Sequence, residues 1–255
     1  MKLLILSDIH GNIDALNAVW EAEKGADRIY CAGDLADYGV FPGEVLRWMR
    51  EHGAVTVRGN HDLHTVRTYE EDHWRQVPDR EFKWVHHNCK KLKPEDIVYL
   101  KSLPETLCFE ADGIGYVMSH QYDSGYGTIE SVQQFERFWQ AAAGNELQGV
   151  KERRAIFGHT HRRCVHVLGE DICWLNPGSV SYRRPDDPCK DAHYIVIESG
   201  KIRLKSVPYD RSRSLAAAME YLRQGKMMES ELQDAMFFFG DAATSREPLP
   251  EPFMN

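Results

Sequence analysis

The chain has 255 residues, of which 42% are hydrophobic and 27% charged, as is typical of a globular protein with one large α/β domain or two small ones. Its formal net charge of −8 argues against contact with the nucleic-acid backbone, which requires clustered lysines and arginines. Because no apolar stretch reaches membrane-spanning length and the six cysteines form no C-x-x-C pair, we expect a cytoplasmic protein with reduced thiols and no membrane contact.

The first sixty residues repeat a strand, a loop and a helix. Apolar runs at residues 3–6, 28–32 and 54–57 predict short buried strands. Amphipathic helical patterns begin at Ile13 and Pro42, after the loops that follow the first two strands. This rhythm predicts right-handed βαβ crossovers and a largely parallel sheet.

The second half of the chain is richer in predicted hairpins. Residues 63–103 are expected to form a helical insertion, and two further helices are expected within residues 211–240. Short strands are predicted at residues 107–110, 114–118, 155–157, 165–168, 172–175, 194–197 and 202–207. We expect two sheets packed face to face in a single domain over residues 1–240, followed by a proline-rich loose tail at 241–255.

Potential metal ligands directly follow five of the predicted strands. They are Asp8 and His10, Asp34, Asn60 and His61, His120, and His159 and His161. Because ligands bind at the carboxyl ends of the strands in an open α/β sheet, these side chains are expected to converge at one edge. Eight oxygen and nitrogen donors exceed the needs of one divalent ion and suit two ions that share a carboxylate. The lack of thiolates disfavours a structural zinc site.

Each of these residues also has a purely structural interpretation. Asp34 and Asn60 could be ordinary turn residues, Asp62 could be a helix N-cap, and His120 could be a packing histidine. The metal-site interpretation is favoured because the structural alternative would have to hold for all five blocks at once.

The five blocks resemble those of the calcineurin-like metallophosphoesterases, in the order in which that family has them. They are D-x-H at 8–10, G-D at 33–34, G-N-H-D at 59–62, the lone His120, and G-H-T-H at 158–161. The segment N-P-G-S-V at 176–180 resembles the bacterial and archaeal small phosphodiesterase branch. The resemblance extends over residues 1–207 and implies a four-layer α/β/β/α sandwich with its metal site at the C-terminal strand edge.

The resemblance also implies roles for individual residues around two divalent metal ions. One ion would be held by Asp8, His10 and His161, the other by Asn60, His120 and His159, with Asp34 as the bridge. The expected metals are Mn²⁺ or Fe, with Zn²⁺, Ni²⁺ and Co²⁺ as alternatives. A metal-bridging hydroxide would attack phosphorus in line. His61 would protonate the leaving alkoxide, and Asp62 would orient the His61 ring.

The expected substrate is a small nucleotide-type phosphodiester or phosphoanhydride, such as a diadenosine polyphosphate or a cyclic nucleotide. Tyr38, Tyr122 and Arg183 lie in loops after the metal-ligand blocks and are candidate substrate contacts, and residues 63–103 are a candidate lid. A phosphoprotein or phosphomonoester phosphatase is the closest alternative. A non-catalytic scaffold with the same fold is an alternative of another class. The oligomeric state stays open.

Overall fold

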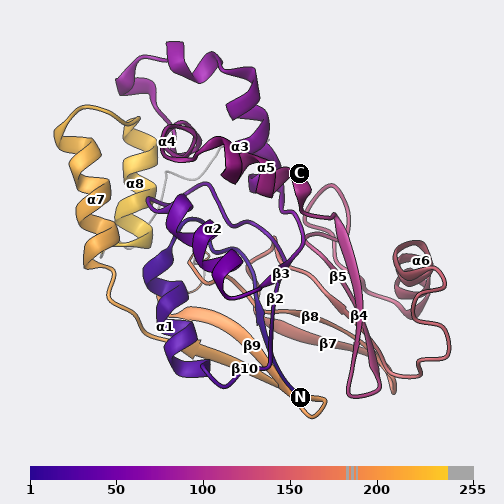
Figure 1. Cartoon of the computed structure of the whole chain (residues 1–255). Helices are drawn as coiled ribbons and strands as arrows, with labels where there is room; N and C mark the ends of the chain where they lie inside the picture. The colour runs from indigo at the N-terminus through magenta and orange to yellow at the C-terminus, as the bar shows by residue number, and fades with distance from the viewer. Residues whose placement is uncertain (182–183, 185–186, 188, 241–255) are drawn as a thin grey trace.

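Two five-stranded sheets pack face to face in the computed structural model, which describes residues 1–181, 184, 187 and 189–240 (Figure 1). The expected tail at 241–255 therefore lies outside the described residues. None of the helices in the described part of the chain has the length and apolarity needed to cross a membrane.

The first sheet has the strand order β10-β9-β1-β2-β3. Its strands are β1 (Lys2–Leu6), β2 (Arg28–Cys31), β3 (Val55–Thr56), β9 (Ala192–Glu198) and β10 (Lys201–Val207). β1, β2 and β3 are parallel to one another, and α1 (Ile13–Glu23) and α2 (Pro42–Glu51) connect them. The prediction of βαβ units in this half is thus confirmed, and β9 joins the sheet antiparallel to β1.

The second sheet has the order β4-β5-β6-β8-β7. Its strands are β4 (Thr106–Ala111), β5 (Ile114–Ser119), β6 (Arg153–Ile156), β7 (Cys164–Gly169) and β8 (Ile172–Asn176). The hairpins β4–β5, β7–β8 and β9–β10 are the three that the sequence predicts, whereas β5, β6 and β8 run parallel. Helix α6 (Val132–Ala143) lies outside this sheet (Figure 1).

Three apolar clusters show how the layers are stacked. Ile5 of β1 lies in the cluster between the sheets with residues of β5, β6 and β8. Its neighbour Leu6 points the other way and packs with residues of α1 and α2. On the outer face of the second sheet, Val117 packs with Phe135 and Trp139 of α6. Strands buried on both faces read as continuous apolar runs, which is why β1 is entirely apolar after its first residue. The predicted α/β fold, with two sheets flanked by helices, is confirmed.

The helical region before β4 consists of three helices and two short 3₁₀ turns. These are α3 (Asn60–Glu71), 3₁₀ turns at His73–Gln76 and Asp79–Glu81, α4 (Trp84–Lys91) and α5 (Pro94–Ser102). Helix α3 begins before residue 63, where the helical insertion was expected to start. The carboxylate of Asp62 accepts the backbone N–H of Gly59 at 2.9 Å and caps the helix at this earlier point. Asn60 and His61, the potential ligands that follow β3, therefore lie in the first turn of a helix.

The two C-terminal helices, α7 (Ser212–Arg223) and α8 (Glu229–Phe238), pack beside α4 (Figure 1). The backbone N–H of Trp84 donates to the Glu231 carboxylate at 3.1 Å. His87 of α4 is buried, stacks on Tyr221 of α7 with ring centroids 3.8 Å apart, and its Nε2 lies 2.6 Å from the Lys226 carbonyl oxygen. The neutral ring with a proton on Nε2 satisfies this contact.

Acid is expected to destabilise this helix junction through His87. Burial lowers the pKa of His87 to about 4, although the hydrogen bond to Lys226 opposes the shift. Above pH 6.5 the ring is neutral in the folded and unfolded states, but between pH 6.5 and 4 only the unfolded chain takes up the proton. We expect this single group to lower the free energy of unfolding by about 1–2 kcal/mol between pH 7 and pH 5.

Urea unfolding of the wild type and of His87→Gln at both pH values measures this contribution. The Gln variant keeps a donor but cannot titrate, so its loss of stability between pH 7 and 5 should be smaller by that amount. His73→Gln, at an exposed position of the first 3₁₀ turn, is the matched control and should retain the wild-type pH dependence. An equal pH dependence in wild type and His87→Gln would contradict the prediction.

Candidate metal centre

All seven predicted metal ligands lie at the same edge of the sandwich. Asp8 and His10 follow β1, Asp34 follows β2, Asn60 begins α3 after β3, His120 follows β5, and His159 and His161 follow β6. Both sheets therefore contribute, through the carboxyl ends of five strands. Residues that the sequence separates by up to about 150 positions meet here because the two sheets face each other.

The backbone of this edge has an unusual conformation at the potential ligands themselves. Five of them have positive φ angles: Asp8 (55°), His10 (47°), Asp34 (57°), His159 (61°) and His161 (55°). The left-handed region costs non-glycine residues free energy, so the surrounding contacts must hold these loops in place. The N–H of Asp8 donates to the Gly33 carbonyl oxygen at 2.9 Å, and the N–H of His159 donates to the Asp8 carboxylate at 3.2 Å.

Glycines beside the potential ligands allow the loops to approach one another closely. A Cβ atom at Gly59 would overlap Oδ1 of Asp34, and one at Gly158 would overlap the Ser7 hydroxyl oxygen. The glycines of G-N-H-D and G-H-T-H are therefore required by close contact between loops of different strands.

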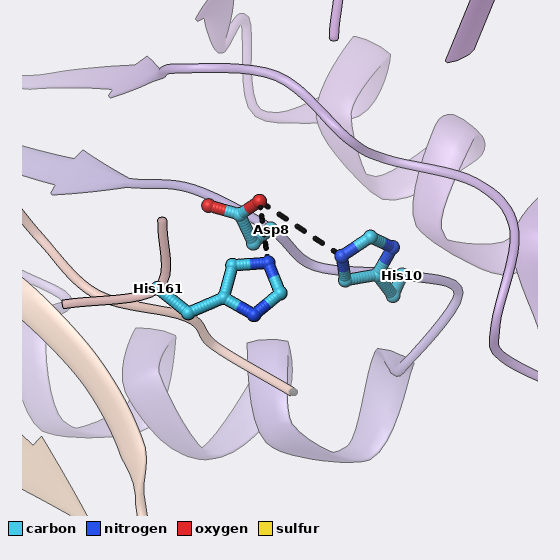
Figure 2. Close-up of side chains that lie close together, drawn as sticks. All are labelled: Asp8, His10 and His161. Carbon is cyan, nitrogen blue, oxygen red and sulfur yellow. Dashed lines mark ion pairs between the residues drawn. The ribbon is translucent and has the colours of Figure 1, made fainter. Parts of the chain in front are cut away.

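The first group of donors consists of Asp8, His10 and His161, which point toward one another (Figure 2). Asp8 Oδ1 lies 3.0 Å from His161 Nε2 and 3.9 Å from His10 Nε2. Burial lowers the pKa of His10 to about 4, against the opposing charges of Asp34 and Asp8. The imidazole is therefore neutral at physiological pH, and the neutral ring is the form that binds metal ions.

The second group consists of Asn60, His120 and His159. Asn60 Oδ1 lies 2.8 Å from His120 Nε2 and 3.0 Å from His159 Nδ1. Nδ1 of His120 is 2.6 Å from the Ala32 carbonyl oxygen, a contact that places a proton on Nδ1 and turns Nε2 toward the other donors.

Asp34 lies between the two groups. Its Oδ2 is 3.2 Å from His120 Nε2 and 3.9 Å from His10 Nε2, and its Oδ1 accepts the N–H of His61 at 2.8 Å. Burial opposes ionisation of Asp34, but the positive charge of nearby His120 outweighs it and holds the pKa of Asp34 far below its usual value.

The donor set fits divalent cations. Ligand atoms of Asp8, Asp34 and His120 lie within 4.8 Å of one another, and all three side chains are buried. Burial lowers the pKa of His120, yet the charge of Asp34 prevails and raises it to about 10. Two buried carboxylates this close thus create a field that strongly favours positive charge. Carboxylate, amide and imidazole donors around Asp34 could hold two ions, with Asp34 available to both.

Asp62 has a different position from the one that the sequence predicts. Its buried carboxylate accepts backbone N–H groups of Asp34 (3.0 Å), Leu35 (2.8 Å), Ala36 (3.2 Å) and Gly59 (2.9 Å). The prediction that Asp62 orients the His61 ring is therefore wrong. Asp62 instead fastens the loop that carries Asp34 to the start of α3.

Asp37 takes the place expected for Asp62 and was missed by sequence reasoning. Its Oδ2 lies 2.8 Å from Nδ1 of His61 and 3.3 Å from Nδ1 of His64. Burial alone would lower the pKa of His61, but the hydrogen bond to Asp37 and the charge of Asp34 raise it to about 9. The sequence does contain one sign of this role. Asp37 is a second acidic residue three positions after Asp34, and the sequence predicts no partner for its carboxylate.

A pocket of about 260 Å³ opens onto these groups. Its lining residues are Asp34, Tyr38, Asn60, His61, Tyr126, His159, Thr160, His161 and Arg184. Tyr38, a candidate substrate contact, lies in this pocket, and its ring is 4.5 Å from that of His61. His61 thus faces the same space as the potential metal ligands.

The other two candidate substrate contacts, Tyr122 and Arg183, are not found in this pocket among the residues that the structure describes. Tyr122 is not among the lining residues of this pocket and packs against Phe138 and Phe157. Tyr126, four residues later, lies in the pocket and stacks on His159 with centroids 4.7 Å apart. Arg183 lies outside the described residues. The neighbouring Arg184 does line the pocket.

Comparison with known proteins identifies one family. The model of the calcineurin-like phosphoesterase superfamily domain matches residues 1–200. An uncharacterized protein of Methanocaldococcus jannaschii is 27% identical over 228 residues, which cover 82% of this chain and 88% of that protein. A symmetrical bis(5′-nucleosyl)-tetraphosphatase of Psychromonas ingrahamii is 30% identical over 162 residues, or 61% of this chain. The matched region spans 55% of that enzyme's length.

Solved structures show the same fold. The metallophosphoesterase from Sphaerobacter thermophilus aligns with a TM-score of 0.66 at 22% identity, over 92% of this chain and 98% of its own. A hypothetical protein from Pyrococcus horikoshii OT3 aligns with a TM-score of 0.69 at 16% identity, over 94% and 98%. The two alignments extend over nearly the whole of both relatives.

Proposed function

The chain belongs to the calcineurin-like phosphoesterase superfamily and is a metal-dependent phosphoester hydrolase, and we propose that it cleaves phosphodiester or phosphoanhydride bonds of small nucleotide-type molecules in the cytoplasm. The observation that carries the proposal is the convergence of two donor groups on Asp34, beside a pocket that also contains His61. The relative from Psychromonas ingrahamii, named as a symmetrical bis(5′-nucleosyl)-tetraphosphatase, supports a dinucleoside polyphosphate as the substrate. A cyclic nucleotide is the other candidate among small nucleotide-type molecules.

We assign two metal positions within the donor set. Asp8, His10 and His161 would hold one ion, Asn60, His120 and His159 would hold the other, and Asp34 would bridge them. Mn²⁺ or Fe suit these ligands, with Zn²⁺, Ni²⁺ and Co²⁺ as alternatives. Two such ions supply positive charge that neutralises phosphoryl oxygens and lowers the pKa of water for in-line attack.

His61 is assigned as the general acid. Asp37 engages its Nδ1, which leaves Nε2 as the nitrogen that donates a proton to the leaving oxygen. The hydrogen bond to Asp37, together with the charges of Asp34 and Asp37, raises the pKa of His61 and keeps the ring protonated at neutral pH. Tyr38 packs against the rings of both His61 and His10 and restricts their movement, which favours the productive orientation.

Removal of metal tests the enzymatic assignment. Treatment with a chelator is expected to lower hydrolysis of bis-p-nitrophenyl phosphate by at least about 100-fold, because the charge that stabilises the transition state is lost. Adding Mn²⁺ back should restore the rate, and the metal content of the active protein should approach two ions per chain.

The circular dichroism spectrum of the chelated protein is the control, and it should stay that of a folded α/β protein. Equal rates with and without metal would overturn the assignment and favour a non-catalytic scaffold. A panel of phosphopeptides and phosphomonoesters at fixed Mn²⁺ separates the proposed substrate class from the phosphatase alternatives.

A further inference from the structure

A second and larger pocket adjoins the one that contains the metal ligands. Its volume is about 1020 Å³, against about 260 Å³ for the first. The two pockets share four lining residues, Tyr126, Thr160, His161 and Arg184. They therefore form one continuous groove that runs from the metal ligands along the start of β7.

The groove is positively charged in a protein whose net charge is −8. Arg162, Arg163 and Arg184 line the larger pocket, and Asp187 is the single acidic residue among its described lining residues. Arg184 donates to the Thr160 carbonyl oxygen at 3.1 Å, which holds its guanidinium group where the two pockets meet. Arg162 is exposed at the next position after the potential ligand His161. Guanidinium groups bind phosphoryl oxygens through paired hydrogen bonds.

Flat rings lie at two places in this groove. Tyr126 stacks on His159 and is 76% exposed, so its outer face is open where the pockets meet. In the larger pocket, the exposed ring of His166 stacks on Trp174 with centroids 5.4 Å apart and an interplanar angle of 9°. Trp174 is buried, and its Nε1–H donates to the Ile129 carbonyl oxygen at 2.8 Å, so this support is fixed. A nucleobase can stack on such a supported ring.

We propose that this groove binds the part of the substrate beyond the scissile phosphorus, as a chain of further phosphoryl groups that ends in a nucleoside. This inference rests on the proposed function and narrows the substrate to nucleoside polyphosphates. In the reaction, the oxygen of one water molecule joins the attacked phosphorus and the P–O bond to the bridging oxygen breaks. The leaving group is the rest of the phosphate chain, whose new terminal phosphate lies beside the arginines. The proton released from water passes to solvent. A monoester or a simple diester has no further phosphoryl group to contact Arg162 and Arg163, which line only the larger pocket.

Arg162→Gln tests the groove without touching a potential metal ligand. With Mn²⁺-loaded protein, kcat/KM is measured for diadenosine tetraphosphate and for bis-p-nitrophenyl phosphate, which carries no second phosphoryl group. We expect the ratio of the two values to fall about tenfold to a hundredfold in the variant, mainly through KM, because one charged hydrogen-bond donor is lost. Arg28→Gln has the same change of charge at the opposite end of the first sheet and should keep the wild-type ratio.

A binding measurement tests the phosphate-binding role of the groove independently of turnover. Calorimetric titration of Mn²⁺-loaded wild type should show tripolyphosphate binding about tenfold tighter than orthophosphate, and Arg162→Gln should lose most of that difference. If both phosphates bind alike in the wild type, or if Arg162→Gln changes neither measurement, the groove assignment is wrong. A wild-type protein that fails to hydrolyse bis-p-nitrophenyl phosphate overturns the proposed function instead, and calorimetry still settles the groove.

Discussion

Replacing Asp34 by Asn is expected to lower kcat for bis-p-nitrophenyl phosphate by about 10³-fold or more. Loss of a residue that only supports a ligand commonly costs about 10–100-fold, and the Asp34 carboxylate lies close to imidazole nitrogens of both donor groups, those of His10 and His120. The substitution keeps the shape of the side chain but removes a negative charge from the centre of the site. It also replaces one of the two carboxylate oxygens by an NH2 group, which only donates hydrogen bonds, so the side chain no longer has two oxygens with which to bridge two ions.

The Asp34→Asn variant should also bind fewer than two ions per chain, as metal analysis after gel filtration would show. Asp171→Asn is the matched control, because this exposed acid lies in the β7–β8 turn at the far end of the second sheet. It should retain full activity and metal content. An Asp34→Asn protein with more than about a tenth of the wild-type kcat would show that Asp34 is no bridging ligand.

The second large effect is expected at His61. His61→Ala should slow substrates with alkoxide leaving groups by about 10²–10⁴-fold, the range typical of lost general acid catalysis. Diesters that release p-nitrophenolate should be affected far less, because that group departs without a proton. The measurement is kcat/KM for a 3′,5′-cyclic nucleotide and for bis-p-nitrophenyl phosphate with the same enzyme preparation. Equal slowing of both substrates would rule out the acid role.

Asp37 makes the acid role of His61 testable by pH. A general acid must be protonated, so activity toward poor leaving groups is lost as pH rises through the pKa of His61. Asp37→Asn weakens the hydrogen bond to His61 and removes the Asp37 charge, both of which raise this pKa, so the loss of activity should move to lower pH. His64→Gln serves as comparison, since His64 also contacts Asp37 but is not among the residues that line the metal pocket. An unchanged pH profile in Asp37→Asn would contradict the assignment.

Most of the fold follows from features that are local in the sequence. The apolar run of β1 and the glycine-bounded helices after it are enough to predict βαβ units. The potential ligands follow for the same reason, because a polar residue directly after a buried strand can only lie at the strand edge. Asp8 and His120 could therefore be assigned to the same edge from sequence alone.

The exceptions depend on contacts between distant segments. Asp62 is adjacent to His61 in the sequence, but the helix that starts at Asn60 turns its carboxylate back toward the Asp34 loop. Asp37 reaches His61 because its own backbone has a φ of 65° and its N–H is held by Asn88 of α4. The local sequence pattern predicts neither the left-handed turn at Asp37 nor the position of α4.

Contacts between distant segments also explain why the sequence does not show which of two tyrosines lies in the metal pocket. Tyr122 and Tyr126 lie four residues apart in a glycine-rich loop, and nothing in their spacing shows which of them meets His159. The amphipathic pattern of α7 and α8 likewise predicts helices but not the surface that they cover. They pack against α4 and Val40, beside the turn that presents Asp37 and Tyr38.

The left-handed backbone at five of the potential ligands would affect how metal ions enter and leave. Each such residue raises the free energy of its loop by about 1–3 kcal/mol. The packing of the two sheets offsets this cost when the chain folds. An incoming ion would therefore meet donor loops that are already in place, and its binding free energy would not be consumed in ordering the chain. Metal exchange in this protein should accordingly be a local event, reversible without unfolding and limited by ligand release rather than by refolding of the loops.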